Sequence, residues 1–88
     1  MIDVTKLHTT TLGEGRIRRN LGLQGGDIIN LCRCWVLDDK AVITRKGKNW
    51  YVEVSHVRLT INANSNTVIT AHRIGKRLTR KLKSGYLP

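Results

Sequence analysis

Eighty-eight residues with a mass of 10.0 kDa suffice for one small domain and exclude a second. The apolar fraction of 40% is ordinary for a globular protein, and no apolar run approaches the roughly 18 residues of a membrane span. Residues 1–11 contain no basic start followed by an apolar stretch of signal-peptide length. We therefore expect no export and a cytoplasmic protein.

The net charge of +10 is distributed unevenly along the chain. Residues 1–44 contain six basic and five acidic residues, whereas residues 45–88 contain ten basic residues and a single acid, Glu53. Such self-repulsion is unfavourable unless a polyanion or an acidic protein relieves it. RNA is therefore the first expected partner and an acidic protein the second, and no membrane partner is expected.

Two helices are predicted in the first half of the chain. Threonines at positions 9–11 can cap an apolar repeat that runs from Leu12 to Leu21, and Gly22 supplies a stop. Asp27 is a good N-cap for the second helix. Apolar side chains then recur at helical spacing, at Ile28, Leu31, Cys32, Trp35 and Val36.

Beyond residue 40 the apolar period changes from 3.6 to 2, which predicts strands. Four are expected, over residues 41–46, 49–55, 57–63 and 67–74, and the short loops between them favour an antiparallel meander. The predicted fold is therefore α+β, with two N-terminal helices packed on one face of a four-stranded sheet. We expect one domain over residues 1–75 and a basic C-terminal tail over residues 76–88, in which Lys76 to Lys83 could form a short amphipathic helix.

Alternation along the strands separates two faces of the predicted sheet. The inner face is expected to hold Trp50 in the same core as Trp35 of the second helix, with the other inward side chains at Ile43, Val52, Val54, Leu59, Ile61, Ile69 and Ala71. The opposite side, called the polar face below, collects Thr44, Lys46, Tyr51, Glu53, Arg58, Thr60, Asn62, Thr70 and His72. This face is cationic and contains one carboxylate and one imidazole.

These residue types suit cleavage of RNA through its own 2′-hydroxyl. That reaction needs a base for the 2′-hydroxyl proton, cations for the charge on phosphorus, and an acid for the departing 5′-oxygen. Glu53 or a histidine could be the base and His72 the acid, because an imidazole gives or takes a proton near neutral pH. His8 and Thr70 complete the catalytic candidates, and the cationic candidates are Lys46, Lys48, Arg58 and Arg73.

Two basic segments are further candidates for contacting nucleic acid. Residues 45–49 form a basic hairpin tip in which Arg45, Lys46 and Lys48 surround a glycine, and Tyr51 follows as the aromatic residue able to stack on a base. On the first predicted helix, Arg16 and Arg19 lie on one side and could form one wall of a groove that His8 reaches.

Neither a metal nor a cofactor is expected. Cys32 and Cys34 have the wrong spacing for a zinc knuckle, and no further cysteine is present to complete one. Two near-adjacent thiols in a chain without an export signal are expected to be reduced, one of them in the core.

Four segments carry a family resemblance: Leu7–Thr10 (L-H-T-T), Gly13–Asn20 (G-x-x-R-I-x-x-N), Arg45–Val52 (R-K-G-K-N-W-Y-V) and Ile69–His72 (I-T-A-H). Together, over residues 7–72, they resemble a bacterial family of small proteins that has no established activity. The resemblance implies a histidine where this chain has Asn64. Asn64 is therefore expected to mark a substituted site at which one functional imidazole is missing.

More loosely, two helices followed by a meander that ends in V-I-T-A-H are similar to the barnase, EndoU, colicin and RelE-like RNases. This resemblance implies metal-independent cleavage of RNA from the open face of the sheet and an antitoxin protein as partner. Three interpretations stay open: a metal-independent endoribonuclease toxin, a non-catalytic nucleic-acid-binding module, and a small basic protein neutralised by an acidic partner. The oligomeric state is not predicted.

Overall fold

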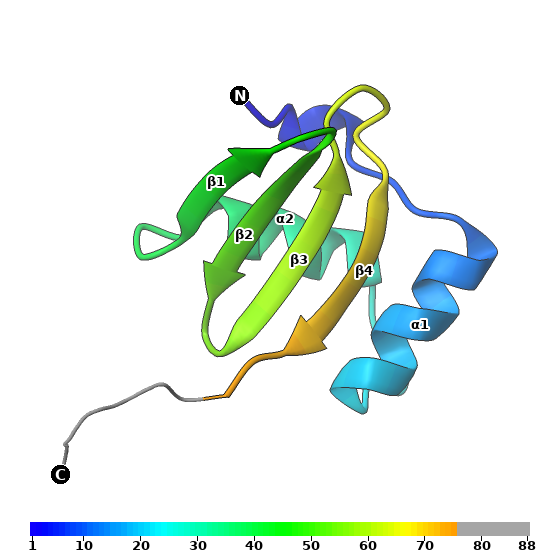
Figure 1. Ribbon diagram of the computed structural model, residues 1–88. Coiled ribbons are helices and arrows are strands. Elements are labelled where there is room, and N and C mark those ends of the chain that lie inside the picture. The colour runs from blue at the N-terminus through cyan, green and yellow to red at the C-terminus, as the bar shows by residue number, and fades with distance from the viewer. Residues whose placement is uncertain (76–88) are drawn as a thin grey trace, which may run out of the picture.

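The computed structural model describes residues 1–75 and confirms the predicted α+β fold (Figure 1). A short 3-10 helix, η1 (Val4–Lys6), precedes α1 (Thr11–Leu21) and α2 (Ile28–Leu37), and the strands follow as β1 (Val42–Lys46), β2 (Asn49–Val54), β3 (Val57–Asn62) and β4 (Val68–Arg73). The strands end at most one residue inside their predicted bounds, and η1 was not predicted. The basic tail and its predicted helix over residues 76–83 lie outside the described residues.

α1 begins one residue before its predicted start and ends at the predicted residue, and α2 begins directly after its predicted N-cap. The Thr10 hydroxyl accepts the Gly13 N–H at 3.0 Å, and Gly22 ends α1 in the left-handed conformation with φ 68°. The Asp27 carboxylate accepts the Asn30 N–H at 3.0 Å at the start of α2. No helix within residues 1–75 is long and apolar enough to cross a membrane.

The sheet is an antiparallel meander in the order β1-β2-β3-β4. Two-residue turns join β1 to β2 and β2 to β3, and these turns fix the register of both pairs. In the second turn Ser55 and His56 have φ of 52° and 63°, the left-handed pair that a tight hairpin requires, so His56 is a turn residue. Successive side chains of β1 and β2 therefore alternate between the two faces as the sequence predicts.

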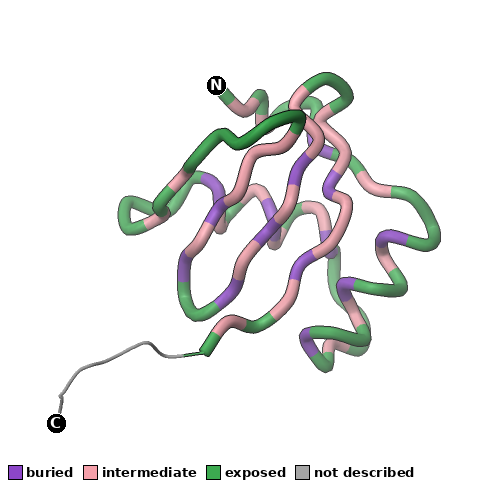
Figure 2. Tube along the Cα trace, in the orientation of Figure 1, coloured by how far each residue is buried: buried purple, intermediate pink, exposed green. Residues whose placement is uncertain are grey.

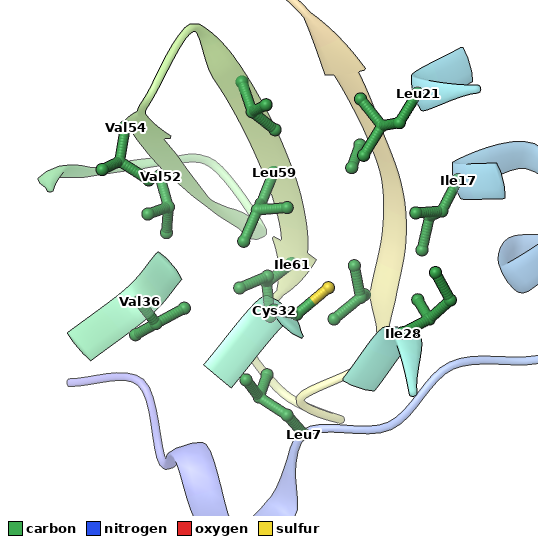
Figure 3. Packing of buried hydrophobic residues seen from close by; sticks show 13 residues of the cluster. Leu7, Ile17, Leu21, Ile28, Cys32, Val36, Val52, Val54, Leu59 and Ile61 are labelled. Carbon is green, nitrogen blue, oxygen red and sulfur yellow. The ribbon is translucent and has the colours of Figure 1, made fainter. Parts of the chain in front are cut away.

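The core lies between the inner face of the sheet and the two helices (Figure 3). In one cross-strand row, the fully buried Val52, Leu59 and Ala71 come from β2, β3 and β4, and a second row pairs Ile61 with Val68. The two helices and the N-terminal segment close the core from the other side. α2 contributes Ile28, Cys32 and Val36, α1 contributes Ile17 and Leu21, and the N-terminal segment contributes Leu7. Burial of these apolar side chains is the main source of stability.

Three predicted core positions require correction. Trp35 and Trp50 are half-buried and pack against the margin of the core, so neither is fully enclosed. Ile69 was predicted to point inward, but the register of β3 and β4 shifts between Thr60 and Ile61, which leaves Ile69 without a partner. This β-bulge changes the alternation along β4, so Val68 occupies the core position in place of Ile69.

The N-terminal segment and α1 cover the outer edge of β4, while α2 lies behind the sheet (Figure 1). The Val68 N–H donates to the His8 carbonyl at 2.7 Å, and the Thr9 hydroxyl donates to the Val68 carbonyl at 2.7 Å. In the last turn of α1, the Asn20 amide donates to the Ala71 carbonyl at 3.2 Å. The L-H-T-T and G-x-x-R-I-x-x-N segments therefore attach α1 to the sheet.

Gly13 and Gly15 lie in the same helix and should respond to alanine in opposite directions. A Cβ atom at Gly13 would overlap the Thr9 hydroxyl and lie 3.3 Å from the Val68 carbonyl, whereas nothing lies within 4 Å of one at Gly15. We expect Gly13→Ala to lower the free energy of unfolding by about 1–3 kcal/mol through overpacking. Gly15→Ala should raise it by about 0.5–1 kcal/mol, since alanine favours helix. Urea denaturation of both variants measures the two changes in the free energy of unfolding. Equal changes would contradict the close packing of Gly13 against Thr9 and Val68.

Candidate functional site

The polar face is built from cross-strand rows that the strand register defines. Glu53, Arg58 and His72 form one row across β2, β3 and β4. The next row contains Tyr51, Thr60 and Thr70, with Thr44 of β1 opposite Tyr51. A third row pairs Asn49 with Lys46 on one side and Asn62 on the other. The structure thus brings together Glu53, His72 and Thr70, which the sequence placed on one face.

Glu53 and Arg58 form an ion pair within the first row. The Nε and Nη2 atoms of Arg58 both donate to Oε2 of Glu53, at 2.8 and 2.6 Å. Within residues 1–75, Oε1 of Glu53 and Nη1 of Arg58 make no hydrogen bond to protein. Both side chains are about 40% exposed, at 38% for Glu53 and 42% for Arg58. The pair therefore presents a carboxylate oxygen and a guanidinium N–H to solvent.

His72 stands on the other side of Arg58 in the same row. Its ring is half-buried, and neither ring nitrogen has a hydrogen-bond partner among the described residues. Because neighbouring strands lie about 4.8 Å apart, the backbones of Glu53 and His72 are about 10 Å apart with Arg58 between them. A carboxylate and an imidazole are thus placed on opposite sides of one guanidinium.

A shallow hollow of about 430 Å³ opens on the polar face. It is lined by Thr44, Lys46, Gly47, Tyr51, Glu53 and Arg58. Two cations and one carboxylate give this lining a net positive charge, and Tyr51 adds an aromatic ring. The hollow can therefore accept an anionic group next to a flat apolar one. His72 does not line it.

Two predicted cationic contacts lie away from the polar face. Arg45 is paired with Trp50, which faces α2, and its guanidinium lies 5.3 Å from the centre of the Trp50 ring. Arg73 is paired with the buried Val57 and donates to the Leu21 carbonyl at 2.8 Å, which caps the end of α1. Alternation puts both residues on the α2 side, so Arg45 and Arg73 do not lie on the polar face, and a contact of either with nucleic acid stays a prediction.

The remaining basic candidates are exposed at the borders of the face. Lys48 is in the β1–β2 turn. Arg16 lies one helical turn before Asn20, whose amide lies 3.4 Å from the Thr70 hydroxyl, so Arg16 borders the polar face along β4. Arg19 is also exposed on α1.

His8 belongs to a separate hydrogen-bonded chain at the far end of β4. Its Nδ1 lies 3.0 Å from the Lys6 carbonyl, which can only accept, so Nδ1 carries a proton. Nε2 lies 3.0 Å from the Thr67 hydroxyl, which contacts the Ser65 hydroxyl at 2.7 Å. Both ring nitrogens are engaged, and the row containing His72 lies at the other end of the strand. His8 is not brought together with Glu53 and His72.

Asn64 is exposed in the turn between β3 and β4. Its N–H donates to the Asn62 carboxamide oxygen at 2.9 Å, and the same oxygen accepts the Ser65 N–H at 3.0 Å. This turn adjoins the His8 chain and not the Glu53 row. Sequence reasoning missed the contributions of Ser65 and Thr67, because isolated hydroxyl residues in a turn give no sign of a tertiary contact with residue 8.

The cysteines behave as ordinary thiols in the fold. Cys32 is buried in the core, and this burial raises the pKa of its thiol to about 11, whereas Cys34 is exposed. Within the part of the chain that the structure describes, no three histidine, cysteine or acidic side chains come together as a metal site. The groups able to transfer a proton to or from a substrate are therefore best sought in the Glu53 row, which holds a carboxylate and an imidazole.

Comparisons with known proteins place the chain in a family without assigning a reaction. No curated protein and no solved structure gives a significant match. The loose resemblance to RNases is therefore not supported by comparison, and any argument for cleavage rests on the polar face. Residues 1–72 match the family model DUF3781, described as "Protein of unknown function (DUF3781)", and the chain belongs to this family.

Proposed function

We propose that the protein is a metal-independent endoribonuclease that cleaves RNA on its polar face. The Glu53 carboxylate takes the proton of a 2′-hydroxyl, and the 2′-oxygen attacks the adjacent phosphorus. Protonated His72 donates its proton to the departing 5′-oxygen, so the P–O5′ bond breaks as the P–O2′ bond forms. The products are a 2′,3′-cyclic phosphate and a 5′-hydroxyl.

The observation that carries this proposal is the register Glu53–Arg58–His72 across three adjacent strands. A phosphate over Arg58 would have a carboxylate on one side and an imidazole on the other, which is the arrangement that in-line transfer through a 2′-oxygen requires. Arg58 would stabilise the charge that develops on the phosphoryl oxygens, and Lys46 would hold a neighbouring phosphate. Since the nucleophile comes from the RNA, the reaction needs no metal-bound water.

The ion pair between Glu53 and Arg58 does not prevent this use. Exposed pairs of this kind contribute about 0–1 kcal/mol, so a phosphate can draw Arg58 toward itself at little cost. The free Nη1 of Arg58 can bind phosphate while Nε still orients Glu53. The pair therefore positions the base beside the cationic group.

The test is incubation of total RNA and of intact ribosomes with the purified chain in EDTA. Cleavage with cyclic phosphate ends supports the proposal, as does growth arrest on expression that depends on Glu53. The same assay on Asn64→His tests whether the turn at Asn64 is a substituted site. If both forms leave both substrates intact, the proposal fails.

A non-catalytic RNA-binding module is the second candidate, favoured by Tyr51 and Lys46 in one hollow. Both candidates predict RNA binding that weakens steeply between about 50 and 200 mM salt, because bound cations are released from phosphates. Lys46→Ala should reduce the slope of log K against log salt by about one unit. Lys40→Ala removes the same charge between α2 and β1, outside the hollow, and should leave the slope unchanged. Fluorescence anisotropy with labelled single-stranded RNA measures both slopes, and binding indifferent to salt would exclude both candidates.

A further inference from the structure

The two edges of the sheet are treated differently by the rest of the fold. At β4 the backbone groups of Val68 and the carbonyl of Ala71 bind His8, Thr9 and Asn20. At β1, on the opposite edge, no element among residues 1–75 lies alongside in the sheet. Four of its five residues are exposed (Figure 2). One edge is closed and the other is open.

The hairpin between β1 and β2 determines which backbone groups of β1 are free. A two-residue turn makes Lys46 and Asn49 a hydrogen-bonded pair, so Thr44 and Val42 also bond to β2. The N–H and C=O groups of Ile43 and Arg45 then point away from the sheet. Within the described residues, none of these four groups has a hydrogen-bond partner outside β1. They match the spacing of an incoming strand.

Proteins protect such an edge from pairing with proline, with a bulge or with charged side chains, lysine above all. β1 has no proline and no register shift against β2. Its charged side chains, Arg45 and Lys46, have the same sign, and Lys48 follows in the turn. Two copies of this edge would place cations against cations. An acidic strand would instead meet complementary charge.

We propose that the β1 edge is a docking site for an extended acidic segment of a partner protein, which adds as a fifth strand. The backbone of the segment would pair with Ile43 and Arg45. Its side chains would alternate, with apolar ones beside Ile43 on the α2 side and acidic ones beside Lys46 on the polar side. This site adjoins the hollow through Thr44 and Lys46 but does not depend on the proposed RNase activity.

The probe is a capped eight-residue peptide of alternating glutamate and valine, titrated into the isotopically labelled chain at about 50 mM salt. On binding, exchange of the Ile43 and Arg45 amide protons should slow. The Thr44 and Lys46 amides should change little, since they are already bonded to β2. Absence of slowed exchange at Ile43 and Arg45, or equal binding of a lysine–valine peptide, would overturn the proposal. So would a peptide that perturbs Tyr51 and Arg58 and leaves β1 unchanged.

Two variants separate backbone pairing from charge. Arg45→Pro removes the outward N–H without removing a bond to β2 and should weaken peptide binding at least tenfold. Arg45→Val keeps the N–H and should weaken binding less, with a smaller salt dependence. Unchanged binding by Arg45→Pro would contradict strand addition, and a dimer formed without peptide would assign the edge to a second copy. Because no RNA is used, failure here leaves the RNase proposal standing.

Discussion

Glu53→Gln and His72→Ala should each lower RNA cleavage by about 100-fold or more and leave the melting temperature near that of the parent. A positioned general acid or base contributes roughly that factor. Both side chains lie on the polar face, outside the core, and the ion pair that Glu53→Gln weakens is exposed. Its loss should cost at most about 1 kcal/mol. Initial rates on a fluorogenic RNA, with thermal melts of the same samples, measure both quantities.

The chain contains matched controls for both substitutions. Glu14 forms an ion pair with Arg18 at 2.8 Å on α1, so Glu14→Gln removes a comparable charge away from the polar face. His56→Asn replaces an imidazole in the β2–β3 turn. Asparagine tolerates the left-handed backbone conformation that residue 56 has there. Both controls should keep full activity. If Glu53→Gln is as active as Glu14→Gln, the carboxylate in the Glu53 row is structural and Glu53 is not the base.

The second large effect concerns stability. Leu59→Ala should lower the free energy of unfolding by about 2–5 kcal/mol, because Leu59 is fully buried between Val52 and Ala71 and alanine would leave a cavity. The total free energy of unfolding of a small domain is only about 5–15 kcal/mol, so this substitution should remove a large share of it. Urea denaturation measures the change.

Leu12→Ala is the matched control for this substitution. Leu12 is 75% exposed on α1, and the same truncation there should change the free energy of unfolding by at most about 0.5 kcal/mol. Equal losses at Leu12 and Leu59 would contradict the assignment of the core. Since Trp35 and Trp50 are only half-buried, alanine at either should cost less than the 3–5 kcal/mol typical of a fully buried tryptophan.

Most of the fold follows from local patterns in the sequence. Asp27 and Gly22 mark helix ends because a cap is a short-range interaction, and the change of apolar period after residue 40 reports which faces are buried. The polar face was predictable for the same reason, since alternation alone places Glu53, Arg58 and His72 on one side. These features depend on few residues at close spacing.

The features that the sequence did not reveal depend on contacts between distant segments. Ile69 reads as an inward residue until the bulge between β3 and β4 shifts the alternation. Nothing near Arg73 in the sequence indicates that its guanidinium donates to the Leu21 carbonyl at the end of α1, 52 residues away in sequence. His8 likewise finds Thr67 only once the N-terminal segment lies beside β4. Composition and period contain no information about these pairings.

The most direct measurement of the central proposal is cleavage of a single-stranded RNA with one 2′-deoxyribonucleotide at the mapped cut position. The parent chain in EDTA should cut the all-ribose RNA to a 2′,3′-cyclic phosphate and a 5′-hydroxyl. It should bind the substituted RNA equally well and leave that position uncut, because the attacking oxygen is missing. Cleavage at the deoxyribose, or products with 5′-phosphate ends, would contradict attack by the 2′-hydroxyl and the roles given to Glu53 and His72.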